Sequence, residues 1–204
     1  MDVVVGIDLS GITRAAKGWT VAAAIKLTDP LTLGELTQVP RGLHGDRILL
    51  EWIETKHPRL VGIDAPLKLP HSVMCVERGC ARCEPGYANY LGRDVDEMAR
   101  ARGGGMPFVM LAAIAFRGIY LARMLRERRI KTVEVYPAAA YRVIGAIGKT
   151  YAERAATLRA VIGDFPWSGP DEIDAICAAL VTARQLMMPA PAAIEGLDGR
   201  IALP

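Results

Sequence analysis

Two short, largely apolar runs at residues 3–8 and 59–64 predict buried strands, and both end in the tetrapeptide Val-Gly-Ile-Asp. Turn-forming residues follow each run and mark the strand ends. Residues 18–26 and 31–39 predict two further strands, joined by short loops as in an antiparallel meander. Residues 132–136 predict a fifth strand. The pattern therefore predicts a five-stranded sheet.

Apolar residues at helical spacing predict the connecting elements. Ile48, Leu49, Trp52 and Ile53 form one face of a helix over residues 46–56. Further helices are expected over residues 94–102, 107–129, 137–144, 151–162 and 170–187, and a small hairpin over residues 193–203.

A helix joins the first strand group to the strand at 59–64, so that strand can lie parallel to the first through a right-handed crossover. We therefore predict an α/β domain with a five-stranded mixed sheet, order 3-2-1-4-5 counted along the chain, and helices on both faces.

The 204 residues suit a single domain spanning 1–204, and 51% hydrophobic residues provide a core that needs no disulfide framework. Residues 66–105 are rich in Gly and Pro, hold three of the 4 cysteines, and are interpreted as an insertion or active-site loop. The chain shows no signal-peptide pattern and no apolar run long enough to span a bilayer, so we expect a cytoplasmic protein.

Acidic residues follow the two matching strands and open the last helix. Asp8 and Asp64 end strands whose carboxyl edges coincide if the strands are parallel, and ligands bind at that edge in open α/β sheets. Asp171 and Asp174 lie three apart in a first helical turn and share a face. Because close carboxylates repel one another, a divalent cation would stabilise them, and oxygen ligands favour Mg²⁺ or Mn²⁺.

A purely structural role is the competing interpretation, and it differs among the four residues. Acidic residues at a helix N-terminus commonly offset the helix dipole, which is sufficient to explain Asp171. Asp8 and Asp64 instead follow apolar strand residues, where a carboxylate is costly unless paired or bound. We therefore predict a shared metal site with catalytic Asp8, Asp64, Asp171 and Asp174.

The order of these motifs resembles known nucleases. The motifs are Gly6-Ile7-Asp8, Gly18-Trp19, Gly62-Ile63-Asp64-Ala65-Pro66, Glu134-Val135-Tyr136-Pro137 and Asp171-Glu172-Ile173-Asp174-Ala175. The chain resembles the RNase H-like superfamily, its last motif resembles Holliday-junction resolvases, and the whole set is similar to the predicted-nuclease family called domain of unknown function 429. The resemblance implies two-metal phosphodiester hydrolysis, with Asp8 bridging the metals and Asp64, Asp171 and Asp174 completing their shells. The Cys-rich insertion departs from this pattern.

A second group of metal-binding residue types lies in the insertion. Cys80-x2-Cys83 has a common zinc spacing, and His71 and Cys75 precede it, so these four residues are candidate ligands of a structural Zn²⁺. A disulfide or free thiols are the alternatives. Cys177, among apolar residues of the last helix, is expected in the core.

Additional cleft residues are Ser10, Lys68, Arg100 and Glu134. Val133 and Val135 flank Glu134 in its strand and face the other side, so Glu134 could point to the cleft. Arg100 precedes Gly103-Gly104-Gly105, in what is either a phosphate-contacting loop or a plain hinge. Basic residues over 123–131 are either a solvated helix end or a phosphate-contacting patch.

Overall charge leaves the partner open. A net charge of +3 allows a nucleic-acid or small phosphoester partner, whereas 6% aromatic residues disfavour a strong single-strand stacking surface. Two alternatives to a nuclease remain. One is a phosphate-handling protein of the actin/sugar-kinase type, whose first phosphate loop Gly6–Gly11 would fit, and the other is a non-catalytic nucleic-acid-binding module.

Overall fold

The computed structural model describes residues 2–10, 19–77, 79–80, 92–102, 108–146, 150–196 and 198–204. The strands are β1 (Val3–Asp8), β2 (Thr20–Lys26), β3 (Thr32–Val39), β4 (Leu60–Asp64), β5 (Thr132–Val135), β6 (Ala193–Gly196) and β7 (Gly199–Ala202). The helices are α1 (Leu43–Lys56), α2 (His71–Met74), α3 (Asp94–Ala101), α4 (Phe108–Glu127), α5 (Pro137–Val143), α6 (Tyr151–Ile162) and α7 (Pro170–Met187).

One mixed sheet contains all the described strands, in the order β3-β2-β1-β4-β5-β7-β6. The expected five-stranded sheet is therefore corrected to seven strands. The C-terminal hairpin does not stand apart: β7 pairs in parallel with β5, through Glu134–Ile201 and Val135–Ala202. Nothing in the local pattern of a hairpin indicates which edge it joins, because that choice depends on contacts distant in sequence.

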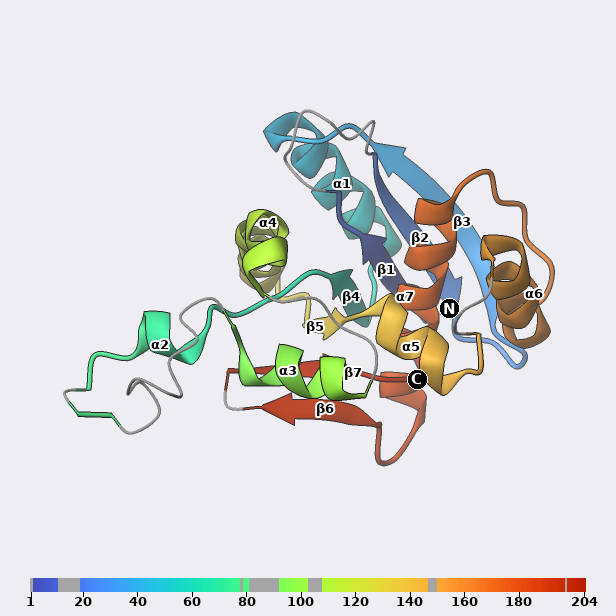
Figure 1. Cartoon of the computed structure of the whole chain (residues 1–204). Helices are drawn as coiled ribbons and strands as arrows, with labels where there is room; N and C mark the ends of the chain where they lie inside the picture. The colour runs from blue at the N-terminus through green and yellow to red at the C-terminus, as the bar shows by residue number, and fades with distance from the viewer. Residues whose placement is uncertain are drawn as a thin grey trace.

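Helices cover both faces of the sheet (Figure 1). The first hydrophobic core packs α5, α6 and α7 against one face and includes Val4, Leu60 and Val135. The second packs α1 and α4 against the opposite face and includes Val5, Ile7 and Val61. The alternation between neighbouring strand residues assigns each apolar side chain of β1 and β4 to one of these two cores.

Two glycines let α7 pack directly on the centre of the sheet. A Cβ at Gly6 of β1 would lie 2.0 Å from the backbone N of Ala179 and 2.5 Å from the backbone O of Ala175. A Cβ at Gly62 of β4 would lie 2.0 Å from Oγ1 of Thr182. The glycines thus remove the side chains that would otherwise hold the helix away from β1 and β4.

Some element boundaries and one helix differ from the sequence expectation. Helix α1 begins at Leu43, three residues before the predicted start, and α4 ends at Glu127 rather than 129. The single turn α2 was not predicted at all. No helix in the described part of the chain combines the length and apolar character needed to cross a membrane.

Candidate active site

The ends of β1 and β4 bring Asp8 and Asp64 side by side. The strands are parallel neighbours, and Asp8 pairs in register with Asp64 just as Gly6 pairs with Gly62 two residues earlier. Residues two apart in a strand point to the same face. Because a Cβ on either glycine would meet α7, both aspartates lie on the α7 face, at the carboxyl ends of their strands.

The first turns of α7 bring Asp171 and Asp174 to the same place. Ala175 and Ala179 lie opposite Gly6, so the residues that precede them in α7 lie near the carboxyl end of β1. The charges of Asp174 and Asp171 both act on Asp8, and the charges of Asp8 and Asp174 both act on Asp64. The four aspartates predicted from the sequence therefore gather at one edge of the sheet, and their role as a site remains a proposal.

Burial and mutual repulsion make this cluster unfavourable when it is fully ionised. Burial is the main cause that raises the pKa of Asp8 well above its usual value, and the charges of Asp174 and Asp171 add to it. Burial likewise raises the pKa of Asp64, with repulsion from Asp8 and Asp174. A bound cation would reverse both effects, since opposite charge favours the ionised form.

Two tyrosines and an arginine hold Asp174 in place. The hydroxyl of Tyr141 donates to Oδ1 of Asp174 at 2.7 Å, and that of Tyr151 donates to Oδ2 at 3.4 Å. The guanidinium of Arg154 lies 4.6 Å and 4.7 Å from the centres of these two rings. Burial still raises the pKa of Asp174, although the hydrogen bonds and Arg154 oppose the increase. The three residues carry no recognisable sequence motif and were not predicted.

The carboxylates of the aspartates lie near one another, but no three of their oxygens lie close enough together to hold one cation. Among the described residues, three ligand atoms that all lie within 4.8 Å of one another occur only in the group His71, Cys75 and Cys80. The carboxylates of Asp8, Asp64 and Asp174 do not meet that condition. Their spacing is therefore wider than one cation held by three of them would need.

The stability of the metal-free protein is expected to fall as pH rises above about 4, the pKa of an unfolded Asp. Because the pKa values of Asp8 and Asp64 are raised in the folded state, that state binds more protons than the unfolded chain until pH exceeds the folded values. Each group then contributes a slope of up to about 1.4 kcal/mol per pH unit.

The measurement is chemical unfolding in the presence of a chelator over a pH series, for the wild type and Asp8→Asn. The stability advantage of Asp8→Asn should grow with pH and disappear near pH 4. A difference that stays constant with pH would contradict a raised pKa for Asp8.

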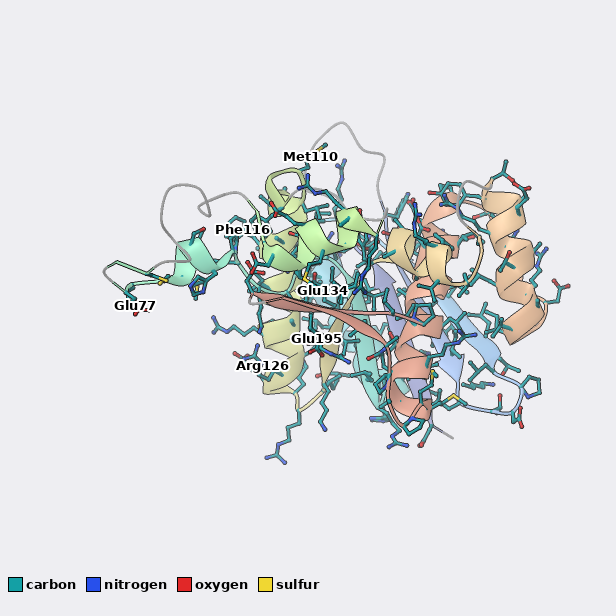
Figure 2. All side chains as sticks on the ribbon, turned by 60° about the horizontal axis from the view of Figure 1, so that its bottom comes forward. Glu77, Met110, Phe116, Arg126, Glu134 and Glu195 are labelled. Atoms are coloured by element: carbon teal, nitrogen blue, oxygen red, sulfur yellow. The ribbon has the colours of Figure 1, made fainter. Side chains whose placement is uncertain are left out.

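Glu134, which was expected to point to the cleft, lines a pocket together with Asp64, and its charge acts on Asp64. Its part in a site stays a prediction. Glu134 pairs in register with Ile63. Ile63 points away from α7, into the core that contains α1 and α4, and residues paired in register share a face, so Glu134 points to the α4 side of the sheet. Nη1 and Nη2 of Arg93 donate to its two carboxylate oxygens at 2.9 and 2.5 Å, and the backbone N of Leu67 donates at 2.8 Å. Figure 2 shows Glu134 inside the molecule.

Arg93 joins the two ends of the insertion to the sheet. Besides Glu134, it donates to both carboxylate oxygens of Asp96, at 2.9 and 2.6 Å. Burial alone would lower the pKa of Arg93, but its hydrogen bonds to the carboxylates of Glu134 and Asp96 raise that pKa above its usual value. The structure thus contains a buried, charged clamp of Arg93, Asp96 and Glu134, and of these three residues only Glu134 stands in a sequence motif.

Glu134→Gln is expected to lower the free energy of unfolding by about 1.5–3 kcal/mol, the usual loss for a hydrogen bond to a charged group. Gln keeps one acceptor but removes the charge that Arg93 requires. Thermal or chemical unfolding measures the loss, and Glu195→Gln is the control because Glu195 forms an exposed pair with Arg200. Equal effects of the two substitutions would show that the clamp contributes nothing.

The remaining predicted cleft residues have different positions. Ser10 lies just beyond β1, where Arg117 donates to its backbone O at 2.8 Å and Thr20 Oγ1 lies 3.0 Å from its hydroxyl. Lys68 lines a groove on the α4 side together with Arg126 and Arg200. Arg100 is exposed on α3 and pairs with Glu97 at 3.8 Å. Among Ser10, Lys68, Arg100 and Glu134, the residue closest along the chain to a predicted metal ligand is Ser10, which lies two positions after Asp8.

A pocket beside Asp64 connects the acidic edge with the clamp. Its lining includes Asp64, Pro66, Arg93, Glu134 and Tyr136. Burial, with the charge of Asp64, raises the pKa of Tyr136 to about 12, so its phenol remains neutral at pH 7. Of the candidate zinc ligands, His71, Cys75 and Cys80 lie together, and Cys83 falls outside the described residues.

Comparisons with known proteins agree with this architecture. The family model described as "Protein of unknown function (DUF429)" matches residues 6–190. No curated protein matches the chain. The structure of RuvC from Thermus thermophilus is similar, with a TM-score of 0.50 and 13% identity over 90% of this chain and 93% of that one. T. thermophilus RuvC in complex with a Holliday junction substrate gives a TM-score of 0.49 and 16% identity over 91% and 93% of the two chains.

Proposed function

The chain belongs to the DUF429 family and has an RNase H-like fold similar to that of RuvC, and we propose that it is a metal-dependent nuclease that hydrolyses phosphodiester bonds. The observation that carries the proposal is the pairing of Asp8 with Asp64 on adjacent parallel strands, facing Asp174 of α7. Fold similarity at this level supports the architecture alone, so the chemistry rests on these side chains.

The donor set fits hard divalent cations. Asp8, Asp64, Asp171 and Asp174 offer only oxygen ligands, which favour Mg²⁺ or Mn²⁺ over softer metals. Two such ions lie about 3.5–4 Å apart in two-metal nucleases. A site for two ions needs carboxylates spread over a longer distance than a site for one ion. The aspartates, which share one edge of the sheet but do not approach within 4.8 Å as a group of three, agree with that.

Each residue of the site has a distinct task in the proposed reaction. Bound Mg²⁺ or Mn²⁺ would activate water and stabilise the leaving oxygen. Asp8 lies beside Asp64 in the sheet and is acted on by the charges of Asp171 and Asp174, so it would serve both ions. Tyr141 and Tyr151 orient the carboxylate of Asp174 through their hydrogen bonds, which restricts its rotation.

Among the described residues, Arg154 is a cation close enough to Asp174 to contact the substrate backbone. It lies over the rings of Tyr141 and Tyr151, close enough to Asp174 to oppose the rise of its pKa. A guanidinium can bind phosphate through two parallel hydrogen bonds. We assign it the binding of a phosphate next to the scissile bond.

The function can be tested with a panel of labelled substrates. The panel contains single-stranded and double-stranded DNA, four-way DNA junctions, RNA and nucleoside triphosphates, each with Mg²⁺, Mn²⁺ or a chelator. We expect cleavage of a nucleic acid that requires the metal. Hydrolysis confined to triphosphates would favour the actin/sugar-kinase type of phosphate chemistry, and metal-independent binding without cleavage would favour a binding module.

A further inference from the structure

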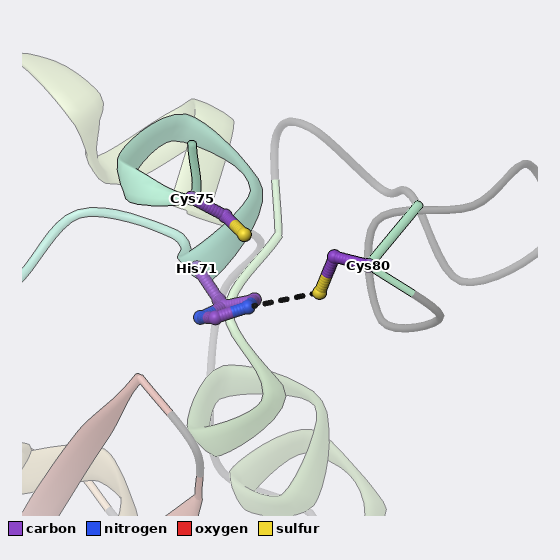
Figure 3. A group of neighbouring side chains, drawn as sticks. All are labelled: His71, Cys75 and Cys80. Carbon is purple, nitrogen blue, oxygen red and sulfur yellow. Dashed lines mark hydrogen bonds between the residues drawn. The ribbon is translucent and has the colours of Figure 1, made fainter. Parts of the chain in front are cut away.

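A group of nitrogen and sulfur ligands lies outside the acidic site, in the insertion that follows β4. The ligand atoms of His71, Cys75 and Cys80 all lie within 4.8 Å of one another (Figure 3). Nε2 of His71 is 3.7 Å from Sγ of Cys80. Zinc bonds of about 2.0–2.3 Å in a tetrahedron separate such ligands by about 3.5–3.8 Å. The spacing of His71 and Cys80 therefore already agrees with a shared Zn²⁺.

Backbone hydrogen bonds place two of these ligands on one side of α2. The backbone N of Cys75 donates to the backbone O of His71 at 2.8 Å, which closes a single helical turn. Residues four apart in such a turn lie on the same face. The backbone N of His71 also donates to Asp198 at 3.3 Å, so the start of the turn is attached to the end of the sheet.

The described residues around these ligands, 71–77 and 79–80, include no buried side chain that could form a hydrophobic core. Helix α2 contains no buried residue. Val73 and Met74 are 55% and 65% exposed, and Val76 is fully exposed. In Figures 1 and 2 this segment, which carries Glu77, forms an arm that projects from the sheet. Small units without sufficient apolar burial commonly depend on a bound metal to fold.

We propose that His71, Cys75 and Cys80 bind a structural Zn²⁺ that folds the projecting arm, defined here as the described residues 71–77 and 79–80. Thiolate and imidazole ligands favour zinc, whereas the oxygen ligands of the acidic site favour Mg²⁺ or Mn²⁺. The two sites would therefore hold different metals. Zn²⁺ in structural sites takes four ligands, and these residues supply three of them.

The two ends of the insertion are already attached to the sheet by hydrogen bonds, so the metal would be needed only to fold the projecting arm. Glu134 accepts hydrogen bonds from Leu67 before the arm and from Arg93 after it. The clamp thus holds the two ends of the insertion together, independently of any metal. Loss of Zn²⁺ should unfold the arm and leave the sheet and the clamp intact.

Elemental analysis of the full chain, purified under reducing conditions without chelators, tests the binding. We expect about one zinc per chain, its loss in Cys75→Ser and Cys80→Ser, and its retention in Cys177→Ala. Cys177 is the matched control because it is buried in α7, away from the arm. Absence of zinc from the wild type, retention of zinc in both serine variants, or a Cys75–Cys80 disulfide in its place would overturn the proposal.

Two further measurements keep the proposal testable if the serine variants fail to fold. Co²⁺ added to chelator-stripped wild type should produce a thiolate-to-metal charge-transfer band, which an all-oxygen site cannot give. Limited proteolysis of the stripped wild type should cut within residues 71–80 at least about tenfold faster than the zinc-loaded protein, since local unfolding governs cleavage. No charge-transfer band, or equal cleavage of the two forms, would overturn the proposal.

Discussion

Asp8→Asn is expected to lower metal-dependent hydrolysis by at least about 10²–10³-fold, the loss that follows removal of one preorganised group at a reacting centre. Asp8 is the carboxylate that lies beside Asp64 in the sheet and also feels the charges of Asp171 and Asp174. Asn keeps the size of the side chain but removes the negative charge. Affinity for Mn²⁺ should fall together with the rate.

The same substitution should leave the fold intact and stabilise the metal-free protein. A buried carboxylate that its neighbours repel costs free energy in the folded state, and Asn removes that repulsion. Calorimetric Mn²⁺ titration, initial cleavage rates and chelator-treated unfolding curves measure the three effects.

Asp164→Asn is the matched control. Asp164 carries the same side chain, but it lies exposed beside Arg159. Mn²⁺ affinity unchanged in Asp8→Asn would remove Asp8 from the site. Cleavage that survives in Asp8→Asn at the wild-type rate would exclude the proposed two-metal mechanism.

Gly6→Ala is expected to lower the free energy of unfolding by at least about 3 kcal/mol, the upper range for overpacking in a core. The new methyl group would lie 2.0 Å from the backbone N of Ala179 and 2.5 Å from the backbone O of Ala175. These are backbone atoms of a helix packed on the sheet, so no single side chain can move aside. Helix α7 must shift as a whole.

A shift of α7 would also separate Asp171 and Asp174 from Asp8 and Asp64. We therefore expect folded Gly6→Ala, where it can be isolated, to bind Mn²⁺ more weakly. Gly169→Ala is the control, because it precedes the same helix and a Cβ there meets no atom within 4 Å. Its effect should stay within about 1 kcal/mol. Equal stability of the two variants would contradict the close packing of α7 on β1.

The periodicity of the chain predicts most elements because each depends on its own residues. The apolar runs before Asp8 and Asp64 predict two buried strands, and the helices over 151–162 and 170–187 begin and end where the structure has them. Helix α6 begins at a capping box of Thr150 and Glu153, a purely local signal. The four aspartates were predicted as candidates in the same way, because each stands at the end of a strand or near the start of a helix.

The sequence was insufficient to predict contacts between segments that are distant along the chain. It predicted five strands, since nothing local in the hairpin 193–202 indicates that β7 pairs with β5. It predicted that Glu134 could point to the cleft, but the alternation of β5 alone cannot show that Arg93 and Leu67 are its hydrogen-bond partners. Arg93 itself lies 41 residues from Glu134, and no motif connects them.

By itself, therefore, the sequence determined the strands, most of the helices and the acidic residues at their ends. Hydrophobic periodicity and the turn-forming residues that end each element act over only a few residues. Only the tertiary structure decided that Gly6 and Gly62 admit α7, that Tyr141 and Tyr151 hold Asp174, and that the clamp at Glu134 secures the insertion. Those contacts depend on packing between surfaces that meet only after the sheet has formed, and side-chain complementarity at that range leaves no periodic signal along the chain.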